Sequence, residues 1–257
     1  MSSGETVEAM SGAGFRRRVL AVAGCGVLTV TATACESTEQ ESAKLAGEDH
    51  LTTAREAKLN LGAANHSVRV SDVTLMSSSG RTAVAVRLTG TSTAAQVNVP
   101  LRVSVTGAGG KLLYSNAAGG QEPSLQRVAL LAPGRAEWWV DDQVLVAKPA
   151  SAAHISVGTG TAAPAGPIPV LSTSGVQLAH QDGLNVINGE LVNHSSRTQN
   201  RVPVFAVALR AGKIVAAGRA VVETLPGGST TPAPFQIFLV GNPAGASVEL
   251  SAVPTAA

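Results

Sequence analysis

Strict alternation of apolar residues with small or polar ones is the feature that most constrains the fold of this chain. In the segment TAVAVRLTG, residues 82–90, valine or leucine stands at every second position from Val84. The segment VNVPLRVSVTG, residues 97–107, shows the same alternation from Val99. Because successive side chains of a β-strand point to opposite faces, each segment predicts a half-buried antiparallel strand.

Turn signals separate these segments at the spacing of a β-sandwich. Gly109-Gly110 supplies a hairpin turn before the segment KLLYS, and short apolar runs follow at VALL, EWWVDD and HISVG. A hydrophobic share of 44% in 257 residues is enough to bury a core. The sequence therefore predicts an all-β fold.

A second copy of this plan follows the proline-rich segment PAGPIPV, residues 164–170. Landmarks recur in the same order at offsets of 103 and then 102: Leu88/Leu191, Ser92/Ser195, Val99-Pro100/Val202-Pro203 and Gly110-Lys111/Gly212-Lys213. The change of offset leaves open whether Val204 or Phe205 takes the core position of Leu101, because a slip of one residue reverses the faces of a strand. Chance similarity between two segments rich in valine and alanine is the alternative to a duplication.

The second copy carries a series of structural motifs. They are the strand residues Gly189, Leu191 and Asn193, the alternating Phe205, Val207 and Leu209, the turn Gly212-Lys213, the loop Leu225-Pro226-Gly227, and Phe235. This series resembles the FxLYD-type immunoglobulin-like domains of bacterial envelope lipoproteins, although Arg210-Ala211 replaces the Tyr-Asp of the family name. The resemblance implies an immunoglobulin-like β-sandwich and transfers no catalytic residue.

The N-terminal region has the pattern of an export signal. Three arginines, residues 16–18, precede sixteen uncharged small or apolar residues, 19–34. This stretch is shorter than the roughly 18 to 20 residues of a spanning helix. It therefore predicts a removed signal peptide, with the Sec or the twin-arginine route and a start at Met1 or Met10 left open.

Two cysteines compete for the role of the processed residue. Cys25 has the better local lipoprotein motif, Val-Ala-Gly-Cys, but only six residues separate it from Arg18. Cys35 follows a complete apolar region and precedes the polar segment ESTEQESAK. We therefore predict that Cys35 is lipidated, which anchors the chain to the extracytoplasmic face of the cell membrane through two or more acyl chains. The alternative is an ordinary secreted protein cut after Ala34.

These features divide the chain into five predicted parts. They are a lipoprotein signal peptide at 1–34, a polar tether at 35–65, a first immunoglobulin-like β-sandwich domain at 66–160, a proline-rich linker at 161–175 and a second such domain at 176–257. Once Cys25 is removed and Cys35 is capped, the mature chain has no free thiol, which excludes thiol catalysis and cysteine metal ligation.

Charge and composition exclude a nucleic-acid partner. The net charge is +2, aromatic residues make up 3% of the chain, and no basic run extends beyond the three arginines. Nucleic-acid binding needs a cationic stripe, usually with aromatic platforms. The preference for alanine, valine, glycine and arginine resembles an actinobacterial composition.

No residues with a catalytic or cofactor-binding pattern stand out. The five histidines show no metal-ligand spacing: His50, His66, His154, His180 and His194. Asp141 and Asp142 are adjacent, so on a strand they point to opposite faces. With Glu137 they are expected at a strand end, and a calcium site there is the alternative. We predict no enzyme activity, no metal and no cofactor.

The adjacent tryptophans Trp138 and Trp139 are the candidate interaction anchors. On a strand one ring fills the core and the other is more exposed, which suits an interface anchor; shielding by a loop or the neighbouring domain is the alternative. The predicted function is a non-catalytic module that binds an envelope protein or glycan, or organises the envelope. The alternatives are an accessory subunit of an envelope enzyme or transport system, and a small-solute or metal carrier.

Overall fold

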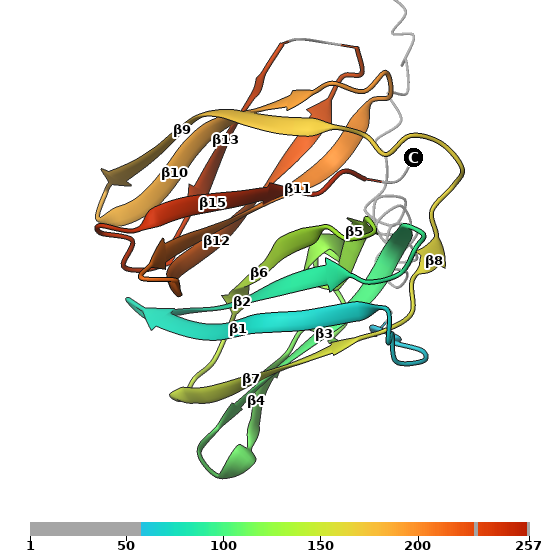
Figure 1. Cartoon of the computed structure of the whole chain (residues 1–257). Coiled ribbons are helices and arrows are strands. Elements are labelled where there is room, and N and C mark those ends of the chain that lie inside the picture. Colours follow the sequence, from blue (N-terminus) through green and yellow to red (C-terminus); the bar gives the residue numbers. More distant parts are fainter. Residues whose placement is uncertain (1–57, 229–230, 256–257) are drawn as a thin grey trace, which may run out of the picture. The chain divides into compact units, whose positions relative to one another are not determined.

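The computed structural model describes residues 58–228 and 231–255, which form antiparallel sheets and two short 3₁₀ turns (Figure 1). The prediction of an all-β fold is therefore confirmed. The predicted signal peptide, Cys35 and most of the predicted tether lie outside the described residues. Among the described residues no helix is long and apolar enough to span a bilayer.

The first half of the described chain pairs two sheets. One sheet has the order β1-β2-β6, formed by Val68–Ser78, Arg81–Gly90 and Ala136–Val144. The other is built around β3 (Gln96–Gly107), which pairs with β4 (Leu112–Ser115), β5 (Arg127–Leu131), β7 (Ala150–Val157) and β8 (Thr161–Ala162). The 3₁₀ turns are Ala108–Gly110 and Pro123–Leu125.

The second half repeats this arrangement. One sheet has the order β13-β10-β9, formed by Ala233–Phe238, Leu184–Asn193 and Leu171–Gln181. The other is centred on β11 (Gln199–Arg210), with β12 (Lys213–Leu225) and β15 (Ser247–Ala252) on its two sides and β14 (Val240–Gly241) beside β12.

The repeat extends to strand ends and backbone conformation. Strands β2 and β3 recur as β10 and β11 with both ends displaced by 103 residues. Five left-handed residues recur at the same offset: Asp72/Gly175, Ser79/Asp182, Gly80/Gly183, Asn98/Arg201 and Gly109/Gly212. A register shift also separates Ser71 from Thr74 in β1 and their counterparts in β9. The two halves therefore share the same arrangement of strands.

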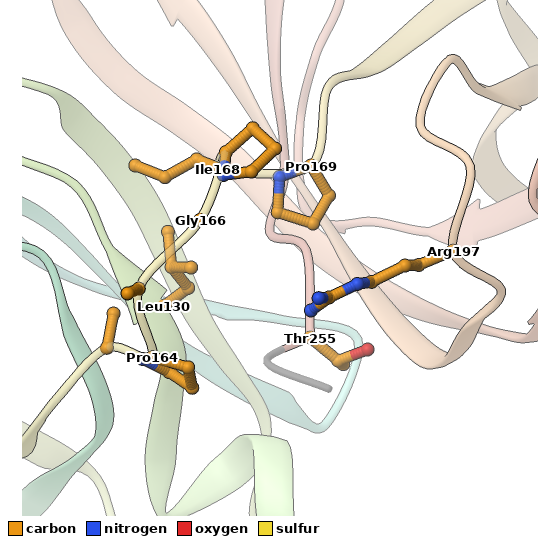
Figure 2. A pocket seen from close by; sticks show the side chains of 10 residues that line it. Leu130, Pro164, Gly166, Ile168, Pro169, Arg197 and Thr255 are labelled. Carbon is orange, nitrogen blue, oxygen red and sulfur yellow. The ribbon is translucent and has the colours of Figure 1, made fainter.

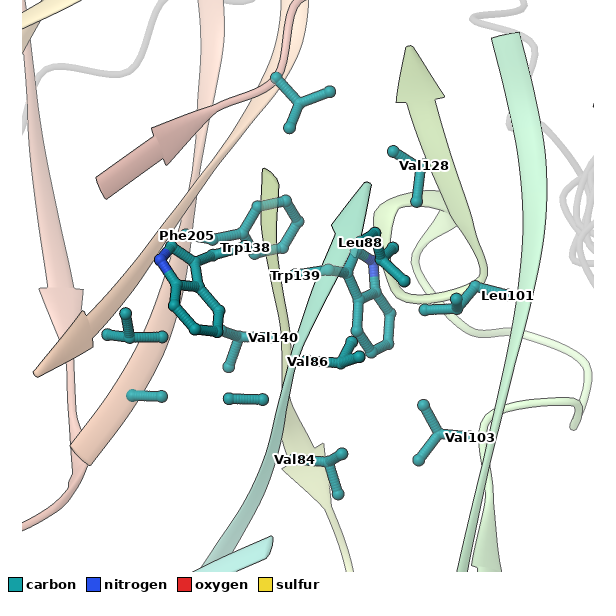
Figure 3. Close-up of a cluster of buried hydrophobic side chains, with 14 of the residues drawn as sticks. Val84, Val86, Leu88, Leu101, Val103, Val128, Trp138, Trp139, Val140 and Phe205 are labelled. Carbon is teal, nitrogen blue, oxygen red and sulfur yellow. The ribbon is translucent and has the colours of Figure 1, made fainter. Parts of the chain in front are cut away.

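This offset settles the register of β11. Val204 takes the position of Leu101 and packs in the core of the second half. Phe205 points the other way and belongs to the buried cluster of the first half, where its ring centroid lies 6.3 Å from that of Trp139 (Figure 3).

The two halves share a buried interface between sheets. Strand β6 contacts β11, β12 and β15, and β2 contacts β12. Ala83 and Ala85 are fully buried, as are Val84 and Val86 on the opposite face of β2. The expectation that β2 is half-buried is therefore wrong. Small alanine side chains leave room for the second half to cover the face that sequence alternation assigned to solvent.

Residues at the predicted domain boundaries belong to the folded halves. Leu59, in the range predicted as tether, is buried and donates its backbone N–H to the Ala117 carbonyl at 3.2 Å. At Gly158 an added Cβ would lie 1.9 Å from the Leu61 carbonyl oxygen, so only glycine allows this close approach. Strand β8 and the start of β9 lie in the range predicted as linker.

Candidate functional site

The tryptophans predicted as interaction anchors both lie in buried positions. Trp139 is 1% exposed in the core of the first half, where its indole N–H donates to the Ser124 carbonyl at 2.8 Å. Trp138 points to the opposite face and is 6% exposed, so the expectation of a more exposed ring is wrong (Figure 3). The neighbouring half shields it, which was the alternative interpretation.

Trp138 connects the two halves through polar contacts as well. Its indole N–H donates to the Glu249 carboxylate at 2.8 Å, and its backbone N–H donates to the Ser251 hydroxyl at 2.9 Å. The Arg87 guanidinium lies 5.5 Å from the ring centroid on the side of the first half. Within the described chain, the anchor that Trp138 provides is intramolecular.

A buried ionic cluster lies across the same interface. Nη1 of Arg219 donates to the Glu122 carboxylate at 2.6 Å and also contacts the Ser124 hydroxyl. Nε of Arg219 lies 3.6 Å from Oδ1 of Asp142. Neither of these last two atoms has a hydrogen-bond partner, so they interact as charges beyond hydrogen-bond distance. Arg219 thus joins two carboxylates of the first half to the second.

The two adjacent aspartates point to opposite faces of β6, as expected. Asp142 faces Arg219, whereas Asp141 is fully buried and accepts a hydrogen bond from the Tyr114 hydroxyl at 2.7 Å. Asp141 also accepts the backbone N–H of Gln143 at 3.0 Å. A carboxylate without solvent exposure and with these partners is a structural group.

Burial and charge shift the acidities of this cluster. Burial, opposed by the Tyr114 hydrogen bond, raises the pKa of Asp141 to about 6. Burial also raises the pKa of Asp142 despite the nearby Arg219. For Glu122, burial is outweighed by the Ser124 hydrogen bond and the Arg219 charge, so its pKa is lowered. Burial and then Asp141 raise the pKa of Tyr114, which keeps its hydroxyl protonated as a donor.

Two of the histidines, for which no metal-ligand spacing was found in the sequence, have local hydrogen-bond partners. His194 shares a hydrogen bond with the Ser172 hydroxyl at 2.6 Å, and His180 shares one with Asn185 at 3.1 Å. Within the described residues, no three acidic, histidine or cysteine side chains gather where they could hold a metal ion.

The motif residues of the second half meet as a structural unit. An added Cβ at Gly189 would lie 2.6 Å from the Phe235 ring, which crosses this glycine. The Asn193 side chain donates to the Arg197 carbonyl at 2.8 Å and to the Leu225 carbonyl at 3.2 Å. These contacts position the strand and the loop that follows it.

Two hollows of different size lie near the interface and the proline-rich segment. One, of about 40 Å³, lies along the proline-rich segment between Leu130, Arg197 and Thr255 (Figure 2). The other, of about 360 Å³, lies beside Asp142 and Arg81. The first is too small for an organic ligand, because such sites span about 300–1,000 Å³.

The largest of the described hollows, about 680 Å³, lies on the outer face of the β9-β10-β13 sheet. It is lined by Gly175, Gln177, Asn188, Gly189, Glu190, Pro234, Phe235 and Gln236. Asn188 pairs in register with Gln177 on one side and with Gln236 on the other, so three amides form a row across the sheet. We call this row, together with Gln181, the amide face.

Hydrogen bonds order the amide face. The Gln236 amide donates to the Gln181 oxygen at 3.0 Å and to the Asn188 oxygen at 2.9 Å. Phe238, 41% exposed, and Leu184 lie exposed on strands β13 and β10 of the same sheet. The arrangement offers fixed donors and acceptors next to apolar surface. It suits reversible binding of a polar ligand.

Sequence reasoning did not find the amide face. Gln177 lies 11 residues before Asn188 and Gln236 lies 48 residues after it, so only the strand register brings them together. Only the internal repeat marks this position in the sequence: at the offset of 103, a polar residue, Asn188, replaces the apolar Ala85 of the first copy.

Comparison with known protein families and with curated proteins gives no match to this chain.

Proposed function

We propose that this chain is a lipoprotein fastened to the extracytoplasmic face of the cell membrane through Cys35. Its two halves are tandem immunoglobulin-like β-sandwich domains that act as a non-catalytic binding module for an envelope glycan or protein. The matching strand order and the matching left-handed residues support the tandem domains. The arginines and apolar stretch before Cys35 support the anchor.

The observation that carries the binding role is the contrast between two equivalent sheet faces. In the first half, the outer face of β1-β2-β6 is apolar and covered by the second half. In the second half, the equivalent face carries the amide face and remains accessible. Polar side chains held in a fixed pattern on an accessible sheet suit ligand recognition.

Binding suits the described side chains better than catalysis. The carboxylate with the largest shift toward neutral pH, Asp141, is enclosed between Tyr114 and the core. A general base must come within hydrogen-bond reach of its substrate, and Asp141 has no path to one. Asp142 is engaged with Arg219.

A pull-down tests this proposal. The soluble fragment 36–257 is immobilised and exposed to an envelope extract, and bound protein, glycan and lipid are identified by mass spectrometry. We expect specific recovery of an envelope component that is lost when Asn188 and Gln236 are replaced. If the fragment recovers only the components that an unrelated β-sandwich protein also recovers, the binding role is contradicted.

A further inference from the structure

We infer that the amide face is a binding surface for a neutral glycan. This inference rests on the proposed binding function and names its ligand class. The observation behind it is the row Gln177, Asn188 and Gln236, which lines a hollow of about 680 Å³.

The chemistry of the row fits sugar hydroxyls. Each side-chain amide offers an acceptor oxygen and a two-proton donor, and a hydroxyl is likewise both donor and acceptor. Within the described chain, the Gln236 oxygen and the Asn188 amide nitrogen have no hydrogen-bond partner. Both groups are therefore available to hydroxyls above the sheet.

The row is ordered before a ligand arrives. Gln236 donates to Gln181 and to Asn188, so two further amides fix its orientation. Ordering of rotamer-rich side chains on binding costs affinity, and prior order reduces this cost. Exposed Phe238 on β13 adds an aromatic surface against which the C–H face of a sugar ring can pack.

The internal repeat argues against another sheet as the occupant. In the first half, the row equivalent to Gln177, Asn188 and Gln236 is Thr74, Ala85 and Val140. Ala85 and Val140 are fully buried beneath the second half. A face covered by protein thus uses small apolar residues in this fold, whereas the accessible copy uses amides.

Charge selects the class of glycan. Glu190 is the one ionised side chain among the residues that line the hollow, and its carboxylate accepts a long hydrogen bond from Ser174 at 3.4 Å. No cation lines this part of the described chain to offset an anionic polymer. A neutral chain of hydroxyls fits the surface, and an acidic polysaccharide meets repulsion from Glu190.

The test uses polysaccharides from the envelope of the cells that make the protein, separated by anion exchange into neutral and anionic fractions. Full-length protein, purified in detergent, is immobilised and its binding to each fraction is measured by biolayer interferometry. We expect saturable binding of the neutral fraction and at least about ten-fold weaker binding of the anionic one.

The variant for this test gives the second half two residues that the first half has at equivalent positions. Asn188→Ala with Gln236→Val introduces the residues that the first half has at the equivalent pair Ala85 and Val140, which this arrangement of strands accepts there. We expect about ten-fold or greater loss of affinity for the neutral fraction, because two hydrogen-bonding side chains are removed. The matched control is Gln143→Ala, an exposed amide on β6, which keeps full affinity. An unchanged unfolding temperature shows that each variant is folded.

Each other outcome overturns the inference. Full affinity in the double variant places the glycan elsewhere, and preference for the anionic fraction contradicts the neutral class. If neither fraction binds, but the pull-down recovers a protein that the double variant loses, the glycan inference fails and the proposed binding function stands. If neither assay recovers a ligand, both fail.

Discussion

The indole N–H of Trp138 donates to the carboxylate of Glu249 at 2.8 Å, joining two residues 111 positions apart in the sequence. The backbone N–H of Trp138 donates to Ser251 in the same strand, β15. Phe205 and Val207 of the second half lie in the same buried cluster as Trp138. The two halves therefore depend on each other for the burial of this face.

Replacing Trp138 with alanine should lower the free energy of unfolding by about 3 kcal/mol, since it leaves a cavity at a buried interface. Trp138→Phe keeps an aromatic ring and loses the N–H, so a smaller loss of about 1 kcal/mol is expected. Urea denaturation of the full chain measures both values. Equal stability of Trp138→Ala and the natural chain would show that the interface does not contribute.

Two arginines that share Glu122 as a partner should differ in their contribution to stability. Arg219 has a side chain 6% exposed and pairs with Glu122 and Asp142, whereas Arg201 is 52% exposed and pairs with Glu122 and Glu223. Arg219→Met strands two carboxylates at the interface and should cost about 3 kcal/mol. Arg201→Met should cost less than about 1 kcal/mol. Equal costs from chemical denaturation would contradict the interface role of Arg219.

The strands could be predicted because their signals are local. The alternation from Val84 and the glycines after Thr106 are sufficient to place β2, β3 and the following turn. The burial of Ala85 could not be predicted, because alanine suits both an exposed strand and a tight interface. A sheet covered on both faces loses the contrast between apolar and polar sides on which the half-buried prediction depended.

The candidate site depends on pairing between distant strands. Gln177 and Gln236 are exposed and Asn188 is half-buried. Taken alone each is an ordinary strand residue, and only the register of β9, β10 and β13 places them in a row. The burial of Trp138 also depends on a distant strand. The sequence predicts that Trp138 and Trp139 point to opposite faces of one strand. It does not predict that β15, which begins more than 100 residues later at Ser247, covers Trp138.

Stability should fall as pH rises through the range in which Asp141 titrates. Burial raises its pKa from 3.8 to about 6, so between these values the folded chain holds a proton that the unfolded chain releases. The free energy of unfolding therefore decreases with rising pH in this window and levels off above it. The raised pKa of Asp142 acts in the same direction, whereas the lowered pKa of Glu122 acts oppositely, at lower pH.

The variant Asp141→Asn should reduce this pH dependence, because the amide oxygen can still accept from Tyr114 and carries no proton to lose. Unfolding temperatures measured from pH 4.5 to 7.5 should decline less in Asp141→Asn than in the natural chain. Asp182→Asn, in the exposed hairpin before β10, is the control and should retain the natural slope. Identical slopes for all three proteins would assign the pH dependence to other groups.

The two cysteines provide the test of membrane attachment. If lipid on Cys35 fastens the chain, Cys35→Ser should release the protein from the membrane fraction, because each buried methylene contributes about 0.8 kcal/mol to anchoring. Cys25→Ser should leave the protein in the membrane, since residue 25 lies in the discarded leader. The intact mass of the natural protein should correspond to a chain that begins at Cys35 and carries a diacylglyceryl group. Release by Cys25→Ser with retention of Cys35→Ser would move the processed residue to Cys25, and a mass without lipid would contradict the anchor.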